Sequence, residues 1–185
     1  IEVTGVFHRR PAYKNPGINW IQADLTQPED VERVMKGVDF IIQAASVTSG
    51  VKDIISRPFI HITDNAVMNS LLLRAAFENK IEHFILFSCS VMYQSNDQPL
   101  KETDFNVDTR MHPRNFGGAW NKIYFEKMCE FFSSQSSTRF TVIRHSNIFG
   151  PHDKFDLEKS HVFGATITKV LSSKDGKIHV WGTGE

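Results

Sequence analysis

The sequence predicts an α/β fold built on a parallel sheet. Short apolar runs alternate with longer segments of helical periodicity along the whole chain of 185 residues, and this alternation is typical of parallel strands joined by crossover helices. Two of the runs, residues 38–42 and 84–87, are strongly apolar, as expected of strands covered on both faces. The content of 41% hydrophobic and 23% charged residues fits a globular domain that buries a core.

The N-terminal half is expected to supply three strands and two helices. The first helix opens at Pro28, because proline suits the first turn of a helix and the acidic Glu29 and Asp30 complement the exposed amides there. Gly37 ends this helix. The expected strands are 2–7, 19–23 and 38–42, and the second helix is 63–79. The buried stripe of the second helix is expected to comprise Val67, Leu71, Ala75 and Ala76.

The C-terminal half continues the alternation around one long polar segment. Residues 94–114 are rich in Asn, Asp, Gln and Pro and are longer than most connections inside a compact domain, so we expect a functional or mobile loop there. The expected strands are 84–87, 140–144 and 178–181, and the expected helices are 120–132 and 162–171.

Charge and cysteine content exclude several classes of protein. The 21 basic and 21 acidic side chains give a formal net charge of zero, which argues against a nucleic-acid partner. No run of about 18 apolar residues indicates a membrane span. The two cysteines, Cys89 and Cys129, do not form the pattern of a secreted disulfide framework. We therefore expect a cytoplasmic protein.

Five passages in order resemble a known family. They are Ala23-Asp24-Leu25-Thr26, Gln43-Ala44-Ala45-Ser46, the segment 87–93 with sequence FSCSVMY, Trp120-Asn121-Lys122, and the segment 147–155 followed by Ser160-His161-Val162. The chain is similar to the extended short-chain dehydrogenases/reductases, the NAD-dependent epimerase/dehydratase family, and within it to the nucleotide-sugar epimerases and reductases such as the GDP-L-fucose synthases. The resemblance implies a Rossmann-like doubly wound parallel sheet, truncated at both ends.

The resemblance also implies a domain division. Residues 1–150 correspond to the NAD(P)-binding Rossmann-like domain without its first strand and glycine loop, and residues 151–185 to the start of the substrate-binding part. The sequence begins at Ile1 rather than at a methionine, so we expect a fragment. The absent glycine loop is the segment that receives the cofactor pyrophosphate in this fold, and we expect this exact chain to bind cofactor weakly.

The end of the first strand bears on the choice of cofactor. Arg9 and Arg10 follow the strand with no nearby acid, and arginine suits a 2′-phosphate whereas an acid suits a free ribose hydroxyl. This favours NADP, with NAD as the alternative, unless the two arginines form only a solvated strand end. The further cofactor-binding residues implied by the resemblance are Asp24, Leu25, Ala44, Ala45, Ser46, Ser88, Lys122, His145 and Asn147. No metal ligands are expected.

The family's chemistry requires a tyrosine as acid/base and a lysine that lowers the pKa of the tyrosine, since a phenol otherwise titrates near 10. The resemblance assigns the lysine to Lys122. The tyrosine belongs four residues earlier, where this sequence has Gly118. The acid/base is then absent, or another residue such as Tyr124 or His112 supplies it.

Other catalytic and substrate-binding residues follow from the same resemblance. The family's strand-end serine or threonine falls on Cys89, and Ser88 or Ser90 replaces it if the loop shifts by one residue. His161 matches a histidine that moves protons in epimerisation, a task that imidazole performs near neutral pH. The catalytic set is Lys122, His161, Cys89 and Ser90, and the substrate-binding set is Ser90, Asn147, Lys169 and Trp181.

These residues predict an NADP-dependent epimerase/reductase acting on a nucleotide-diphosphate 4-keto-6-deoxyhexose, with a nucleotide sugar as its partner. The alternative is a catalytically silent cofactor-binding sensor or scaffold, favoured by Gly118 and Cys89. A third hypothesis is a related sugar-nucleotide epimerase or dehydratase with a different proton donor. The apolar residues Phe125, Met128, Phe131 and Phe132 fit either a homodimer interface or the core.

Overall fold

The computed structural model describes residues 1–10, 12, 14–47, 56–94, 96–109, 111–153, 155–157 and 160–180. The chain divides into two compact units. The first comprises residues 1–47 and 59–146, and the second comprises residues 48–58 and 147–185.

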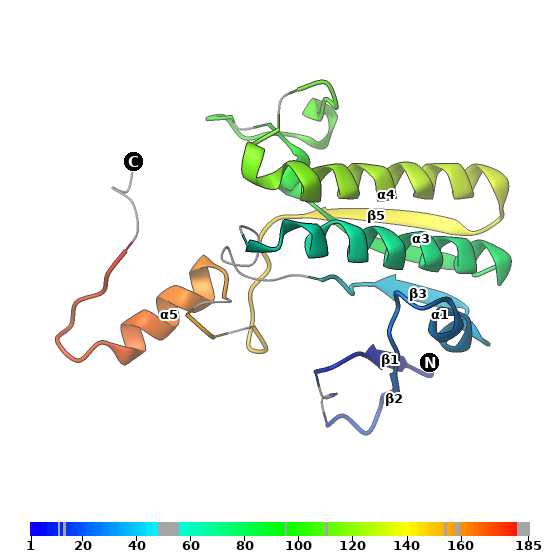
Figure 1. The fold of residues 1–185 in the computed structure, drawn as a ribbon, viewed down its shortest axis with the longest axis horizontal. Coiled ribbons are helices and arrows are strands. Elements are labelled where there is room, and N and C mark those ends of the chain that lie inside the picture. Colours follow the sequence, from blue (N-terminus) through cyan, green and yellow to red (C-terminus); the bar gives the residue numbers. More distant parts are fainter. Residues whose placement is uncertain are drawn as a thin grey trace. The chain divides into compact units, whose positions relative to one another are not determined.

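The strands of the first unit are all parallel, which confirms the predicted α/β class (Figure 1). Strands β1 (Thr4–Phe7) and β2 (Asn19–Gln22) form one two-stranded sheet. Strands β3 (Phe40–Gln43), β4 (His83–Cys89) and β5 (Arg139–His145) form a second sheet in the order β3-β4-β5. Parallel pairing brings the carboxyl ends of the three strands to one edge of the sheet.

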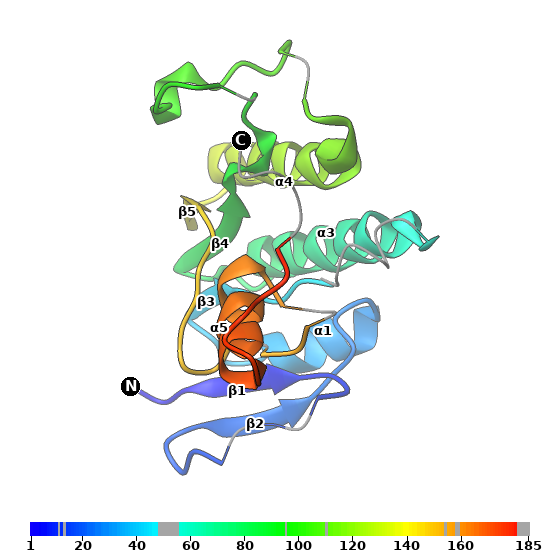
Figure 2. The ribbon, with the colours of Figure 1, turned by 90° about the vertical axis from the view of Figure 1, so that its left-hand side faces the viewer.

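A layer of helices covers one face of the β3–β4–β5 sheet (Figure 2). Its members are α1 (Pro28–Met35), α3 (Thr63–Glu78) and α4 (Phe116–Gln135). Along β4, fully buried residues alternate with half-buried ones. The described part of this unit therefore covers that strand closely on one face, whereas the apolar runs predicted cover on both.

The core lies between this helical layer and the sheet. It is formed by buried residues that include Met35, Leu72, Leu73, Ala76, Phe84, Leu86 and Phe125. Burying each of the leucine, methionine and phenylalanine side chains among them stabilises the fold by about 1.5–3 kcal/mol. One predicted member of the α3 stripe is wrong: Val67 is 46% exposed, because Met68 and Leu72 occupy the face that meets the core.

The helix boundaries follow from local sequence. Helix α1 starts at Pro28 with Glu29 and Asp30 in its first turn, as predicted. It ends before Gly37, whose φ of 70° lies in the left-handed region that favours glycine. Helix α4 begins at Phe116, four residues earlier than expected, and therefore includes Gly118.

The second unit contains helix α5 (Val162–Ser172), close to the predicted 162–171. The rings of Phe149 and Phe163 pack at a centroid distance of 4.1 Å and support its first turn. A strand was expected at 178–181, but residues 178–180 are irregular and Trp181 lies outside the described residues. No neighbouring strand pairs with residues 178–180 in the described chain, so the apolar pattern alone does not produce one.

In the part of the chain that the structure describes, no helix is long and apolar enough to cross a bilayer. Cys89 and Cys129 are both free thiols. Burial raises the pKa of Cys129 to about 12, so this thiol is an inert core residue.

Candidate active site

Lys122, the predicted catalytic lysine, lies on α4 next to β4. Its Nζ donates a hydrogen bond of 2.8 Å to the carbonyl oxygen of Phe87, near the end of β4. Burial lowers the pKa of Lys122, while the neighbouring Cys89 and Glu126 act in the opposite direction. The structure therefore brings the predicted catalytic lysine to the strand end that carries Cys89 and Ser90.

Gly118 lies one helical turn before Lys122 on α4 and is exposed. A Cβ atom at Gly118 meets nothing within 4 Å, so the backbone leaves open space where the family places its tyrosine. Of the two alternative proton donors, Tyr124 is 51% exposed and its ring lies against Phe125, whereas His112 lines a cavity together with Ser90.

That cavity has a volume of about 510 Å³. Its walls come from the ends of β4 and β5, the segment after β4 and the residues that precede α4. The lining residues are Ser90, Val91, Tyr93, Gln94, Asn96, Leu100, Lys101, Glu102, His112, Asn115, Arg144 and Ser146. Hydroxyl, amide and basic groups predominate among them, a lining suited to a polar, hydroxylated ligand.

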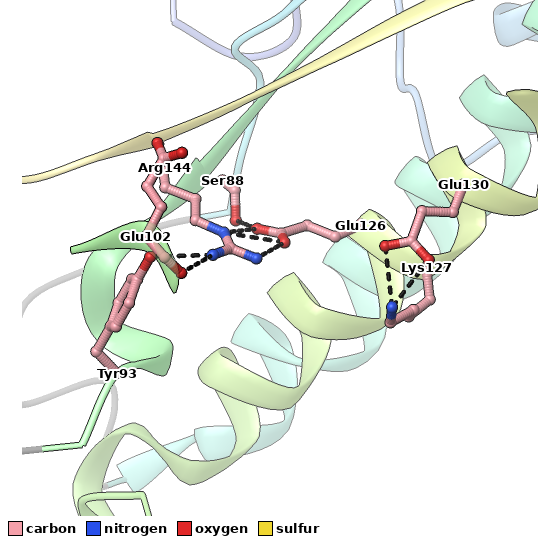
Figure 3. Close-up of polar contacts among 7 residues, drawn as sticks. All are labelled: Ser88, Tyr93, Glu102, Glu126, Lys127, Glu130 and Arg144. Atoms are coloured by element: carbon pink, nitrogen blue, oxygen red, sulfur yellow. Dashed lines mark hydrogen bonds and ion pairs between the residues drawn. The ribbon is translucent and has the colours of Figure 1, made fainter. Parts of the chain in front are cut away.

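Ser88 occupies a different position from Ser90. Its side chain is fully buried, and its Oγ donates a hydrogen bond of 2.5 Å to Glu126 Oε1 (Figure 3). Cys89 is half-buried and, in the parallel register, pairs with His145 at the end of β5. His145 Nδ1 lies 2.6 Å from the carbonyl oxygen of Ser146.

Sequence reasoning missed a buried ion pair next to Lys122. Glu126, one turn after Lys122 on α4, receives hydrogen bonds from the Arg144 guanidinium, the shortest being 2.7 Å (Figure 3). Both side chains are largely buried, and the hydrogen bonds to Glu126 raise the pKa of Arg144. The available signal was a charged residue at the end of an apolar strand, together with an acid in a helix position facing the core.

A second unpredicted group shapes the segment after β3, where Ala44, Ala45 and Ser46 are expected to contact the cofactor. Asn65 Oδ1 accepts hydrogen bonds from the Val47 amide at 2.9 Å and from Ser46 Oγ at 3.2 Å. The Gln43 amide bonds to both Ala45 and Asn69. These buried amides hold the segment while Ala44, Ala45 and Ser46 remain exposed.

At the end of β1, Arg9 and Arg10 are exposed. Asp24, at the end of β2, accepts hydrogen bonds from Thr26 Oγ1 at 2.7 Å and from the Thr26 amide at 3.0 Å. These bonds, with His8 and Arg9 nearby, lower the pKa of Asp24. Leu25 packs against the core.

Asp24 should contribute to the pH dependence of stability. Its folded-state pKa is lowered, so its contribution is present above the pKa of the unfolded chain and is lost as the pH falls through the folded-state pKa. Asp24→Asn should therefore reduce the difference in melting temperature between pH 6 and pH 3. Asp97→Asn, in the exposed part of the 94–114 segment, serves as the control. An undiminished difference in Asp24→Asn contradicts this role.

The remaining predicted residues belong to the second unit. His161 is the N-cap residue of α5, and its carbonyl oxygen accepts a hydrogen bond from Ala165. Lys169 Nζ donates a hydrogen bond of 2.8 Å to the carbonyl oxygen of His179. Asn147 is exposed, and Trp181 lies outside the described residues. Among the residues described, no cluster of His, Cys, Asp and Glu is arranged to hold a metal ion.

Comparison with known proteins places these features in a family context. The chain is 30% identical to the GDP-L-colitose synthase of Yersinia pseudotuberculosis over 171 residues, which is 89% of this chain and 55% of that protein. It is 29% identical to the GDP-L-fucose synthase of Sinorhizobium fredii over 167 residues, 87% of this chain and 53% of that protein. The chain thus spans about half the length of the curated relatives it matches.

Solved structures share the fold. A GDP-L-fucose synthetase from Naegleria fowleri, bound to NADP, superposes with a TM-score of 0.78 at 19% identity, covering 90% of this chain and 58% of that one. The sequence model of the NAD-dependent epimerase/dehydratase family matches residues 1–185. The match covers the whole chain, and the parallel sheets and the lysine at the end of β4 agree with it. The protein therefore belongs to the NAD-dependent epimerase/dehydratase family.

Proposed function

We propose that the protein is an NADP-dependent nucleotide-sugar epimerase/reductase that acts on a nucleotide-diphosphate 4-keto-6-deoxyhexose. The observation that carries the proposal is the hydrogen bond from Lys122 Nζ to the carbonyl oxygen of Phe87, which fixes an ammonium near the end of β4 with Cys89 close by. Ser90 opens onto a cavity of sugar-compatible polarity. The two relatives are named for making GDP-linked deoxysugars, which supports the choice of substrate class.

The residues at the strand ends fit a dinucleotide cofactor with a 2′-phosphate. Two exposed guanidiniums, Arg9 and Arg10, follow β1 and suit that phosphate. Asp24 and Leu25, Ala44 to Ser46, Lys122, His145 and Asn147 would hold the remainder, with Ser88 supporting the strand end from the core. When bound, NADPH supplies the hydride of the reduction.

The protein's own groups supply binding and proton transfer. The Lys122 ammonium binds the ribose and favours the ionised form of any neighbouring acid. His161 moves protons next to the substrate carbonyl during epimerisation, and Ser90 or Cys89 donates a hydrogen bond to the carbonyl oxygen. Asn147, Lys169 and Trp181 contact the nucleotide sugar, with the Lys169 ammonium complementing its diphosphate.

A homodimer through α4 is part of the proposal. Phe125 is a core residue, 1% exposed, and Met128 and Phe132 pack against the same core. Phe131, however, is 59% exposed, and Trp120 and Tyr124 are also exposed on this helix. Phe116, at the start of the helix, is 58% exposed as well. These four aromatic side chains are available to an interface.

The glycine at position 118 favours a second candidate function. Glycine offers no proton, so a protein that retains Lys122 and the strand-end residues is able to bind the cofactor without turning it over. This candidate is a catalytically silent sensor or scaffold of the same family.

A fluorescence titration separates the two functions. NADPH is titrated into the full-length protein with and without GDP-4-keto-6-deoxymannose. If the protein is an epimerase/reductase, it oxidises NADPH only when the sugar is present, and His161→Ala abolishes the oxidation. Tight binding of NADPH without oxidation contradicts this function and supports the catalytically silent sensor or scaffold.

Replacing both strand-end arginines tests the cofactor assignment. Arg9→Ser with Arg10→Ser should weaken NADPH binding by about 10-fold or more, because a charge-assisted hydrogen bond contributes about 1.5–3 kcal/mol. NADH binding should remain unchanged, since NADH lacks the 2′-phosphate. Lys14→Ser, at an exposed lysine in the connection after β1, is the control. Equal losses for both cofactors contradict the assignment.

A further inference from the structure

The Arg144 side chain joins three parts of the first unit at one point. Its Nε and Nη2 donate to the Glu126 carboxylate on α4 at distances of 2.7–3.2 Å. Its Nη1 donates to the Tyr93 hydroxyl at 3.0 Å (Figure 3). The guanidinium carbon also lies 4.9 Å from the centre of the Phe105 ring. Arg144 on β5 therefore ties helix α4 to Tyr93 and Phe105, the two ends of the segment 93–105.

That segment forms much of the wall of the 510 Å³ cavity. Its regular structure in the described residues is limited to one short turn of 3₁₀ helix, Glu102–Asp104, so few backbone hydrogen bonds hold its shape. The Tyr93 and Phe105 rings pack edge to face at 5.6 Å, and the Arg144 guanidinium lies over both. The contacts with Arg144 thus hold the two ends of the segment, Tyr93 and Phe105, together.

Arg144 also contributes to the walls of two cavities. It lines the 510 Å³ cavity and a second cavity of about 360 Å³, which Glu126, Cys129 and Phe140 also line. Its charge is already engaged by Glu126, so the guanidinium serves as a fixed wall. Arginine suits this task, because its planar group donates bidentate hydrogen bonds from its edge and stacks on aromatic rings with its face.

We propose that Arg144, held by Glu126, is a positioning residue that fixes Tyr93 and Phe105 and thereby sets the wall of the cavity that binds the nucleotide sugar. This inference rests on the proposed function. Arg144 acts through the 93–105 segment and not on the reacting atoms. Its loss should therefore weaken binding of the sugar and leave cofactor binding intact.

The test replaces the pair together, because removing Arg144 alone leaves the buried Glu126 charge without a partner and destabilises the fold. In Arg144→Met with Glu126→Gln, the amide oxygen still accepts the Ser88 hydrogen bond and no buried charge remains. The matched control is Lys127→Met with Glu130→Gln, which removes an exposed ion pair of 2.8 Å from the same helix (Figure 3). Melting temperature, the Kd of NADPH and the KM of GDP-4-keto-6-deoxymannose are measured for each.

The double variant at Arg144 should keep the wild-type melting temperature and, measured at pH 7, the wild-type NADPH Kd. Its sugar KM should rise by about 10-fold or more, since small displacements of substrate-positioning groups have effects of this size. Tyr93→Phe should raise the sugar KM in the wild type and have no further effect in the double variant. The control pair should leave all three quantities unchanged.

Two results overturn the positioning role. One is a wild-type sugar KM in the folded double variant, and the other is a parallel loss of NADPH affinity, which indicates general damage. If the wild type shows no turnover, the calorimetric Kd of the same sugar replaces KM. A wild type that does not bind the sugar refutes the proposed function and this inference together, whereas sugar binding that is insensitive to Arg144 refutes this inference alone.

Discussion

Gly118→Tyr should raise turnover by about 100-fold or more, because a positioned general acid contributes about 10²- to 10⁴-fold to a reaction rate. Residues four apart lie on the same face of a helix, so the new phenol projects from the same side of α4 as Lys122. The Lys122 ammonium would then lower the pKa of the phenol. A Cβ atom at Gly118 meets nothing within 4 Å, so the first atom of the new side chain causes no clash. The measurement is kcat for NADPH oxidation with GDP-4-keto-6-deoxymannose in the full-length protein.

Gly118→Phe is the matched control for that prediction. It adds the same ring without the hydroxyl, so a gain in Gly118→Tyr alone identifies proton transfer as the cause. Neither variant should lose stability, because glycine inside a helix costs about 0.5–1 kcal/mol relative to alanine. If both variants fold and have equal kcat, the absence of a phenol at position 118 is not what limits turnover. In that case His112, which lines the cavity with Ser90, becomes the group to replace.

The regular elements were predictable because their signals are local. Proline and two acids mark the start of α1, and a left-handed glycine follows its end. Predictions failed where the outcome depends on distant partners. Val67 is apolar yet exposed, because the face of α3 that packs is set by the sheet beneath it. The expected strand at 178–181 lacks a pairing neighbour in its described part, and periodicity carries no information about neighbours.

The same distinction between local signals and distant partners applies to the residues of the candidate site. Lys122 follows from a short motif within one helix, and the structure places it at the end of β4. The Glu126–Arg144 pair joins α4 to β5 across 18 positions of sequence, and each residue alone resembles an ordinary surface charge. Asn65 likewise supports the segment after β3 from a distance of 18 positions. Hydrogen-bond partners of this kind are chosen by packing, so a single sequence does not reveal them.

Lys122→Met should weaken NADPH binding by about 10- to 100-fold, since a hydrogen bond from a charged group contributes about 1.5–3 kcal/mol. The expected loss of affinity applies whether the protein is an enzyme or a catalytically silent cofactor-binding protein, because both hypotheses place the cofactor ribose at Lys122. If the protein is an enzyme, turnover falls as well. Methionine replaces the buried stem of the lysine with an apolar chain of similar length, so packing is retained. The Kd comes from NADPH fluorescence, and the fold is checked by melting temperature.

Lys127→Met separates a local effect from a change in the total charge of α4. Lys127 lies five residues further along the helix, is exposed, and pairs with Glu130, so its removal should leave the NADPH Kd unchanged.

Glu126→Gln adds a second test. Glu126 raises the pKa of Lys122, so neutralising it should lower that pKa and shift the loss of NADPH affinity at alkaline pH toward lower pH. An NADPH affinity that is the same in Lys122→Met and in the wild type contradicts the assignment of Lys122 to the cofactor. The hydrogen bond from Lys122 to Phe87 would then serve only to join α4 to β4.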